Sequence, residues 1–272
     1  MTNIKTIGVV GTGRMGLPII GHLARKGFAT RAYDIDARKR GSVVERGAQW
    51  DSDAATLAAH ADAILVCVGY DREVRELLAS GGPLRNARPG TIVAVLSTVL
   101  PQTVRELADE AASRGVHVID STVCRGAEAA DRGALLSFVG GAPEIVARIT
   151  PVLRAYSSDV VHTGDVGTAQ VAKAVNNLIL WACLVADHEG LALAKAHGVD
   201  VDALRQALLA SSATNGPLDK WGTQTMAWAD DDLAIVARMA ADAGIALPQS
   251  GLVREICRTL KPRRYDLDAY GR

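Results

Sequence analysis

The fold follows from one stretch near the start of the chain, Ile4-Lys-Thr-Ile-Gly-Val-Val-Gly-Thr-Gly-Arg-Met-Gly16. The apolar run Ile4–Val10 predicts a strand, the glycines predict a tight turn, and a helical pattern follows from Leu17 to Lys26. A GxGxxG motif alone is a weak signal, but a strand before it and a helix after it are the context that a dinucleotide-binding loop requires. The first glycine allows the turn, the second lets a pyrophosphate approach the backbone, and the third lets helix and strand pack closely.

The next predicted strand, Phe28–Tyr33, ends in an acidic residue, Asp34. An acid at this place can accept hydrogen bonds from both ribose hydroxyls and repels a 2′-phosphate, so the sequence favours NAD over NADP. The basic residues Arg31 and Arg38-Lys-Arg40 keep NADP open, since an arginine can hold that phosphate, although such a run is more often a solvated helix face. The residues expected to contact the cofactor in this region are Gly11, Thr12, Gly13, Arg14, Met15, Gly16, Asp34 and Ile35.

Strands and helices continue to alternate to about residue 164. Further strands are predicted at Ala63–Val68, Thr91–Leu96 and Val116–Asp120. Strands separated by helices of about a dozen residues indicate a parallel, doubly wound sheet of the Rossmann type. Ligands bind at the carboxyl ends of such strands, which adds Val68, Gly69 and Thr98 to the expected cofactor contacts. Ser97 and Thr98 could also cap the helix that follows.

From Asp165 onward the alternation stops and alanine-rich helical patterns run nearly to the end. We therefore expect a dinucleotide-binding domain over 1–164 and an all-α domain for substrate and oligomer contacts over 165–272. The first helix of that domain, at about 165–196, would be roughly 48 Å long and would join the two domains. Later helices are predicted at 201–210, 218–228, 231–243 and 249–260, and the end, 261–272, reads as a tail or an oligomer contact.

Composition narrows the functional classes. The formal net charge is zero, which argues against a general nucleic-acid binder. The longest apolar runs are far shorter than the roughly 20 residues that span a bilayer, and the first residues alternate as a strand does, so we expect a soluble, cytoplasmic protein. The four cysteines have no paired spacing, and His188 and His197 lack the HExxH pattern, so neither a disulfide framework nor a metal site is expected.

One polar stripe interrupts the apolar helix near residue 170. Gln170, Lys173, Asn176 and Asn177 are spaced three and four apart and share a helix face. Burying an unpaired ammonium is costly, so Lys173 either reaches water or has a use for a desolvated amine. A solvated stripe on an amphipathic helix is the alternative.

Several motifs, taken in order along the chain, resemble the β-hydroxyacid dehydrogenase family, which includes 3-hydroxyisobutyrate dehydrogenase and tartronate semialdehyde reductase. The resemblance implies a Rossmann domain, a helical domain, NAD(P) and a lysine general acid/base. By this analogy Lys173 is catalytic, Asn177 orients an acidic small-molecule substrate and Thr98 lies near the nicotinamide. The motifs are GTGRMG at 11–16, Asp34, Ser-Thr-Val at 97–99, Asp120 through Gly126, Val139-Gly-Gly141 and G-x₅-K-x₂-N-N at 167–177.

Two departures from the family pattern concern the substrate. Where relatives usually carry Ser-Gly-Gly, this chain has Cys124-Arg125-Gly126. Arginine can clamp a carboxylate with two hydrogen bonds, but it could instead close the site or face solvent. Where the family commonly has Lys-Asp-Leu, the chain has Asp231-Asp232-Leu233, so an expected lysine contact is missing. The residues expected to bind substrate are Thr122, Cys124, Arg125, Gly126 and Asn177.

The chemistry agrees with the resemblance, because hydride leaves a carbinol carbon only as the hydroxyl proton is taken up by a nearby base. The leading prediction is an NAD-dependent oxidoreductase that acts on a hydroxyacid or its semialdehyde. Two alternatives remain: an imine-reductase-like relative, which would usually lack Lys173, and an NAD-binding protein without catalysis. The long helix and the apolar helical domain favour a homodimer or homotetramer.

Overall fold

The apolar runs of the N-terminal half form one nine-stranded sheet in the computed structural model, which describes residues 4–79 and 81–271. The first six strands run parallel in the order β3-β2-β1-β4-β5-β6. This is a doubly wound sheet, the fold class predicted from the sequence. The strands are β1 (Thr6–Val10), β2 (Ala29–Tyr33), β3 (Gln49–Trp50), β4 (Ala63–Val66), β5 (Ile92–Val95), β6 (His117–Asp120), β7 (Val123–Cys124), β8 (Leu135–Gly140) and β9 (Ser157–Gly164).

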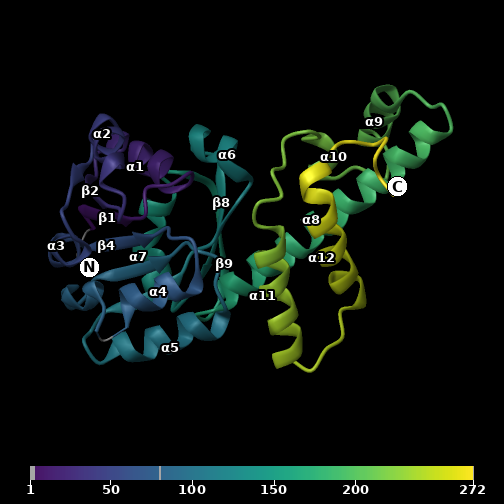
Figure 1. The fold of residues 1–272 in the computed structure, drawn as a ribbon. Helices are drawn as coiled ribbons and strands as arrows, with labels where there is room; N and C mark the ends of the chain where they lie inside the picture. Colours follow the sequence, from purple (N-terminus) through teal and green to yellow (C-terminus); the bar gives the residue numbers. More distant parts are fainter. Residues whose placement is uncertain (1–3, 80, 272) are drawn as a thin grey trace. The chain divides into compact units, whose positions relative to one another are not determined.

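Helices cover both faces of this sheet (Figure 1). One hydrophobic cluster packs α1, α6 and α7 on one face, and a second packs α3, α4 and α5 on the other. Every residue of β4 and β5 is buried for this reason, as expected of parallel strands covered on both sides. The helical segments are α1 (Gly16–Arg25), η1 (Ala37–Lys39), α2 (Arg40–Glu45), α3 (Ala54–His60), α4 (Asp71–Leu78), η2 (Pro83–Asn86), α5 (Pro101–Ala112), α6 (Gly126–Arg132) and α7 (Pro143–Leu153).

The far edge of the sheet departs from the parallel arrangement. Strand β8 runs antiparallel to both β6 and β7, and β9 then runs parallel to β8. The helix before β8, α6, has only seven residues, too short for the usual crossover between parallel strands. The backbone reverses instead, with positive φ at Gly126 and Gly133.

The chain divides into two units at Lys173 and Ala174, inside helix α8 (Thr168–Ala196). With 29 residues, α8 is about 44 Å long, close to the length expected for the joining helix. Within the described residues it is also the one helix whose length and mean hydropathy, 1.4, would allow it to cross a membrane. Core helices pass the same test, and α8 supplies Trp181, Leu184 and Val185 to the core of the second unit.

The second unit is entirely helical, as predicted. Its core joins α8 to Leu233 of α11 and to Val253 and Cys257 of α12. The segments after α8 are α9 (Val201–Leu209), α10 (Gly216–Asp219), α11 (Ala229–Asp242), α12 (Pro248–Leu260) and η3 (Lys261–Arg263).

The helix predicted over 218–228 was wrong. Only the four residues of α10, Gly216–Asp219, are helical here. Gly222 and Met226 have φ values of 87° and 54°, and this left-handed conformation cannot continue a right-handed helix. Met226 is 1% exposed. The apolar spacing that resembled a helix in the sequence therefore reflects a side chain that is buried by an irregular segment.

The end of the chain is not a free tail, which corrects the first of the two interpretations given to 261–272. The backbone N–H of Tyr265 donates to His188 Nε2 at 3.0 Å, and His188 Nδ1 lies 2.7 Å from the carbonyl oxygen of Leu184. Because the Tyr265 N–H must donate, Nδ1 carries the imidazole proton. The rings of Tyr265 and Tyr270 stack beside His188, with centroids 5.1 and 6.3 Å away. A neutral histidine therefore fastens the C-terminal segment to α8.

Acidification is expected to loosen this segment. Burial lowers the pKa of His188 below the value of about 6.5 in an unfolded chain. The stabilising contribution of the neutral ring is thus present above that pH and is lost as pH falls through the lower folded value. Thermal unfolding midpoints between about pH 8 and pH 5 should fall more steeply for the wild type than for His188→Gln. The exposed His197→Gln is the control, and a wild-type slope in His188→Gln would contradict the prediction.

Candidate active site

The three glycines of the first loop have the roles expected of a dinucleotide site. Gly11 has φ of 90°, and a Cβ there would lie 2.4 Å from the carbonyl oxygen of Cys67. A Cβ on Gly16 would lie 2.0 Å from the oxygen of Gly11, so only glycine lets α1 pack this closely against β1. Gly13, in contrast, is exposed and has no atom within 4 Å of a Cβ position. The open space is therefore at the glycine where a pyrophosphate approaches.

Asp34 lies at the carboxyl end of β2, beside this loop. Its Oδ2 accepts hydrogen bonds from the Thr12 N–H at 2.7 Å and from Lys39 Nζ at 2.8 Å, and its Oδ1 accepts from the Asp36 N–H at 3.0 Å. Burial raises the pKa of Asp34, but these hydrogen bonds outweigh it and hold the pKa below its usual value. The side chain is consequently anionic and would repel a 2′-phosphate. Ile35, the next residue, is 93% exposed.

Three of the nearby basic residues are paired with carboxylates. Arg31 pairs with Asp51, and Arg38 pairs with Asp36 at 2.8 Å. Lys39 pairs with Asp34 itself, which places a cation directly beside the acid that was predicted to favour NAD. The side chain of Arg38 is 90% exposed and fits the alternative of a solvated helix face. The side chain of Arg31 is 16% exposed and fits it less well.

The ends of β4 and β5 are joined by a hydrogen bond. Ser97 Oγ donates to the carbonyl oxygen of Val68 at 2.8 Å, and the Gly69 N–H donates to Glu73 at 2.8 Å. Helix α5 has Leu100 at its N-cap and no side-chain cap, so the capping role considered for Ser97 and Thr98 is wrong. Thr98 is half-buried at this edge of the sheet.

A buried carboxylate holds the start of α8. Asp120, at the end of β6, is fully buried, and its Oδ1 and Oδ2 accept the N–H groups of Gly167 at 2.8 Å and Gln170 at 2.9 Å. Burial raises the pKa of Asp120, and the two N–H groups partly oppose that effect. An anion at a helix N-terminus is favourable because the first N–H groups have no partner within the helix. Sequence reasoning assigned Asp120 to a motif but missed this role.

Gln170 adds a second attachment of α8 to the sheet. Its Oε1 accepts the Val99 N–H at 2.9 Å, and its Nε2 donates to the Ser97 carbonyl oxygen at 2.8 Å. Thr122 Oγ1 donates to the Ala169 carbonyl oxygen at 2.9 Å. Gln170 and Thr122 are both fully buried, so Gln170 belongs to the scaffold rather than to a solvated stripe. The hydroxyl of Thr122, expected to meet substrate, likewise donates to the helix.

Lys173 comes from the next turn of α8 and reaches the predicted substrate loop. Its Nζ donates to the Val123 carbonyl oxygen at 2.8 Å and lies 3.8 Å from Cys124 Sγ. Lys173 is half-buried and Cys124 is 4% exposed. The lysine amine thus lies against strand β7, within the segment predicted to bind substrate.

Asn177 follows one turn later on α8, in the second unit. It is buried, and its Oδ1 accepts a hydrogen bond from Asn176 Nδ2 at 3.0 Å. The two neighbouring amides therefore hold each other, with Asn176 supplying the donor.

Arg125 is already paired with a carboxylate of its own chain. Its guanidinium lies 2.7 Å from Asp159 and 2.8 Å from Ser158 Oγ, and it holds the pKa of Asp159 below its usual range. The backbone at Arg125 is left-handed, with φ of 84°, a conformation suited to glycine. A clamp on substrate would therefore have to draw this guanidinium away from Asp159.

The segment Asp231–Leu233 lies in the first turns of α11 and has structural contacts. Asp232 Oδ2 accepts a hydrogen bond from Trp181 Nε1 at 3.0 Å, and Leu233 is fully buried in the core of the second unit. Asp231 is exposed. Within the described part of the chain, no group of three His, Cys, Asp or Glu side chains is arranged to hold a metal ion.

Two family models match nearly the whole chain. Residues 6–164 match the NAD binding domain of 6-phosphogluconate dehydrogenase, and residues 167–269 match the NAD-binding domain of NADP-dependent 3-hydroxyisobutyrate dehydrogenase. A 3-hydroxyisobutyrate dehydrogenase of Pseudomonas aeruginosa is 30% identical over 93% of this chain and 87% of its own length. The chain belongs to the β-hydroxyacid dehydrogenase family.

Two further similarities agree with the family. An NAD-dependent L-serine dehydrogenase of Pseudomonas aeruginosa is 29% identical over 89% of this chain and 84% of its own length. The structure of a Mycobacterium tuberculosis 3-hydroxyisobutyrate dehydrogenase with L-serine superposes with a TM-score of 0.87 at 24% identity, covering 98% of this chain and 97% of that one. This β-hydroxyacid dehydrogenase is an NAD(P)-dependent oxidoreductase acting on CH–OH groups.

The buried acid at the base of α8 yields a test of the scaffold. In Asp120→Asn one acceptor oxygen becomes an NH₂ group facing a buried N–H, which should lower the free energy of unfolding by about 1–3 kcal/mol. Chemical denaturation measures the change. Asp165→Asn removes an exposed charge next to the same helix and should stay within about 0.5 kcal/mol of the wild type. Equal stability of Asp120→Asn and the wild type would exclude the capping role.

Proposed function

We propose that Lys173 is the general acid/base of an NAD-dependent hydroxyacid dehydrogenase. The observation that carries this proposal is the position of Lys173 Nζ, 2.8 Å from the Val123 carbonyl oxygen and 3.8 Å from Cys124 Sγ. Asp120 and Gln170 attach the start of the same helix to the sheet edge, so the amine is carried by a fixed element. Fixed placement matters because a general base must lie within hydrogen-bond reach of the proton it removes.

A nicotinamide, when bound, would accept hydride in oxidation and donate it in reduction. Lys173 Nζ accepts the hydroxyl proton of the substrate as the carbinol becomes a carbonyl, and it returns a proton in the reverse direction. The Val123 carbonyl oxygen orients the amine by accepting one of its N–H bonds. Asn177, one turn further along α8, can hydrogen-bond the substrate through its amide without adding charge.

NAD is the proposed cofactor, in preference to NADP. Gly13 leaves room for the pyrophosphate, while Gly11 and Gly16 allow the tight turn and the close packing of α1. Thr12, Arg14 and Met15 complete the loop. Asp34 would accept the ribose hydroxyls, and exposed Ile35 offers an apolar surface to the adenine. Lys39, paired with Asp34, is the group that could admit NADP by neutralising that acid. The three remaining proposed cofactor contacts are Val68, Gly69 and Thr98, with Thr98 near the nicotinamide.

The proposed substrate is a small hydroxyacid whose carboxylate meets the loop of Thr122, Cys124, Arg125 and Gly126. A relative with L-serine as its named substrate supports a compact acid. Arg125 contributes the positive charge, shared between Asp159 and the substrate. We further propose that residues 1–164 bind the cofactor, that residues 165–272 contribute substrate and oligomer contacts, and that the protein works as a cytoplasmic homodimer or homotetramer.

The lysine role predicts a loss of turnover without a loss of cofactor. Lys173→Met should lower kcat by about 10²- to 10⁴-fold, the usual contribution of a positioned acid/base, while calorimetric NAD affinity stays unchanged. Nicotinamide absorbance with a panel of hydroxyacids, run with NAD and with NADP, measures both rate and cofactor preference. Lys195→Met alters a surface lysine of the same helix, paired with Asp268, and serves as control. Full turnover in Lys173→Met would refute the proposal. If the wild type binds NAD but oxidises none of the acids, the alternative of a non-catalytic NAD-binding protein is favoured.

The arginine role predicts an effect on substrate affinity. Arg125→Gly should raise KM for acidic substrates about tenfold, because loss of one charge-assisted hydrogen bond costs roughly 1.5 kcal/mol, with little change in kcat. Asp159→Asn is the matched variant: it frees the guanidinium and should leave KM equal or lower. An unchanged KM in Arg125→Gly would eliminate the clamp.

A further inference from the structure

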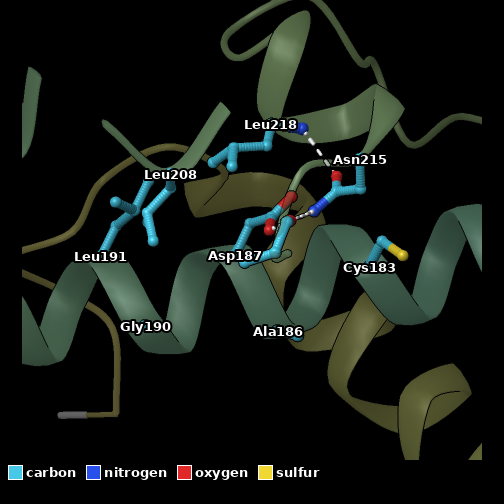
Figure 2. Close-up of a pocket in the computed structure, with 9 residues that line it drawn as sticks. Cys183, Ala186, Asp187, Gly190, Leu191, Leu208, Asn215 and Leu218 are labelled. Atoms are coloured by element: carbon cyan, nitrogen blue, oxygen red, sulfur yellow. Dashed lines mark hydrogen bonds between the residues drawn. The ribbon is translucent and has the colours of Figure 1, made fainter. Parts of the chain in front are cut away.

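The helical unit contains a half-open cavity of about 270 Å³ between α8, α9 and the segment leading into α10 (Figure 2). This is several times the roughly 30 Å³ that a water molecule occupies in the liquid. All of its walls come from residues 183–218, so the cavity belongs to the second unit alone. The walls are mostly apolar, and the lining includes Ala186, Leu191, Leu208, Ala213 and Leu218.

One carboxylate, Asp187, forms the polar end of this cavity. Its Oδ1 accepts a hydrogen bond from Asn215 Nδ2 at 2.9 Å, and the two side chains face each other across the cavity wall (Figure 2). Asn215 is itself fixed, because its Oδ1 accepts the Leu218 N–H at 2.9 Å and caps α10. Asp187 Oδ2 is buried and accepts no hydrogen bond from any described residue. The carboxylate is therefore oriented by one oxygen, while the other is buried without a hydrogen-bond donor.

A positive charge beside Asp187 would stabilise its carboxylate. Burial raises the pKa of its carboxyl, and only the hydrogen bond from Asn215 opposes this effect. The pKa of the Cys183 thiol, on the same wall, is also raised, first by burial and then by the negative charge of Asp187. Asp187 is half-buried, but its Oδ2 is buried, and a buried acceptor is costly unless a donor meets it. A cation would remove that cost and would bring the strongest type of hydrogen bond.

We propose that this cavity is a binding site for a small primary ammonium compound with a short apolar chain. The ammonium donates to Asp187 Oδ2, and the chain lies against Leu191, Leu208 and Leu218. The site uses none of the residues assigned to hydride transfer. Ammonium binding would therefore be a function of the helical unit that is separate from the proposed dehydrogenase chemistry.

A second feature of the cavity allows it to be closed without touching the acid. Gly190 lies on the α8 wall, and no atom lies within 4 Å of where its Cβ would be. A leucine at this position would occupy the space while improving helix propensity by about 1 kcal/mol relative to glycine. Gly190→Leu should therefore fold at least as stably as the wild type and leave the Asp187 carboxylate intact.

Isothermal titration of the full chain with n-butylammonium chloride tests the proposal, at constant ionic strength and with n-butanol and sodium butyrate as probes of equal length. The wild type should bind the ammonium ion saturably and the other two much more weakly. Asp187→Asn keeps the acceptor for Asn215 and should weaken ammonium binding at least tenfold. Gly190→Leu should abolish it. Asp219→Asn, an exposed acid outside the cavity, should bind as the wild type does.

Three results would overturn the proposal. They are equal binding of butanol and butylammonium, retained affinity in Asp187→Asn, and absence of saturable binding by a wild type whose far-ultraviolet dichroism is native. Sedimentation under the titration conditions identifies one cause of the last result, because a dimer that excludes the probe would show the cavity to be an interface between copies. NAD affinity measured in Gly190→Leu separates this test from the dehydrogenase proposal, since it should be unchanged.

Discussion

The hydrogen bonds between the Asp120 carboxylate and the first N–H groups of α8 are the constraint on which the site depends. They join the carboxyl end of β6 to Gly167 and Gln170, and they satisfy donors that a buried helix end would otherwise leave unpaired. Gln170 adds two bonds to the loop after β5. Lys173 follows on the next turn, so its amine reaches Val123 because the base of its helix is held at both neighbouring strands.

Much of the fold could be predicted because the central parallel strands β4 and β5 are buried on both faces and are therefore apolar throughout. An apolar pattern does not indicate strand direction, so the antiparallel pairing of β8 with β6 was not expected. The irregular segment after α10 was mistaken for a helix because the pattern shows that Met226 is buried but not that its φ is positive.

The candidate site likewise contains features that the sequence indicates and features that only the structure shows. The loop glycines and Lys173 could be found because motif, order and spacing identify them locally. The structural roles of Asp120 and Gln170 could not be found, since their partners are backbone atoms 47 to 73 positions away. The ion pair of Arg125 with Asp159 is equally non-local, with 34 positions between its members, and it changes the interpretation of the arginine from a free clamp to a shared one.

The left-handed backbone at Arg125 also bears on how this loop can vary. A side chain in that conformation costs about 1–2 kcal/mol relative to glycine, and Arg125 holds it at φ of 84°. A glycine would be the most stable residue here, and an arginine recovers only part of the strain through a half-exposed ion pair. The loop thus carries a positive charge at its edge at some cost in folding stability.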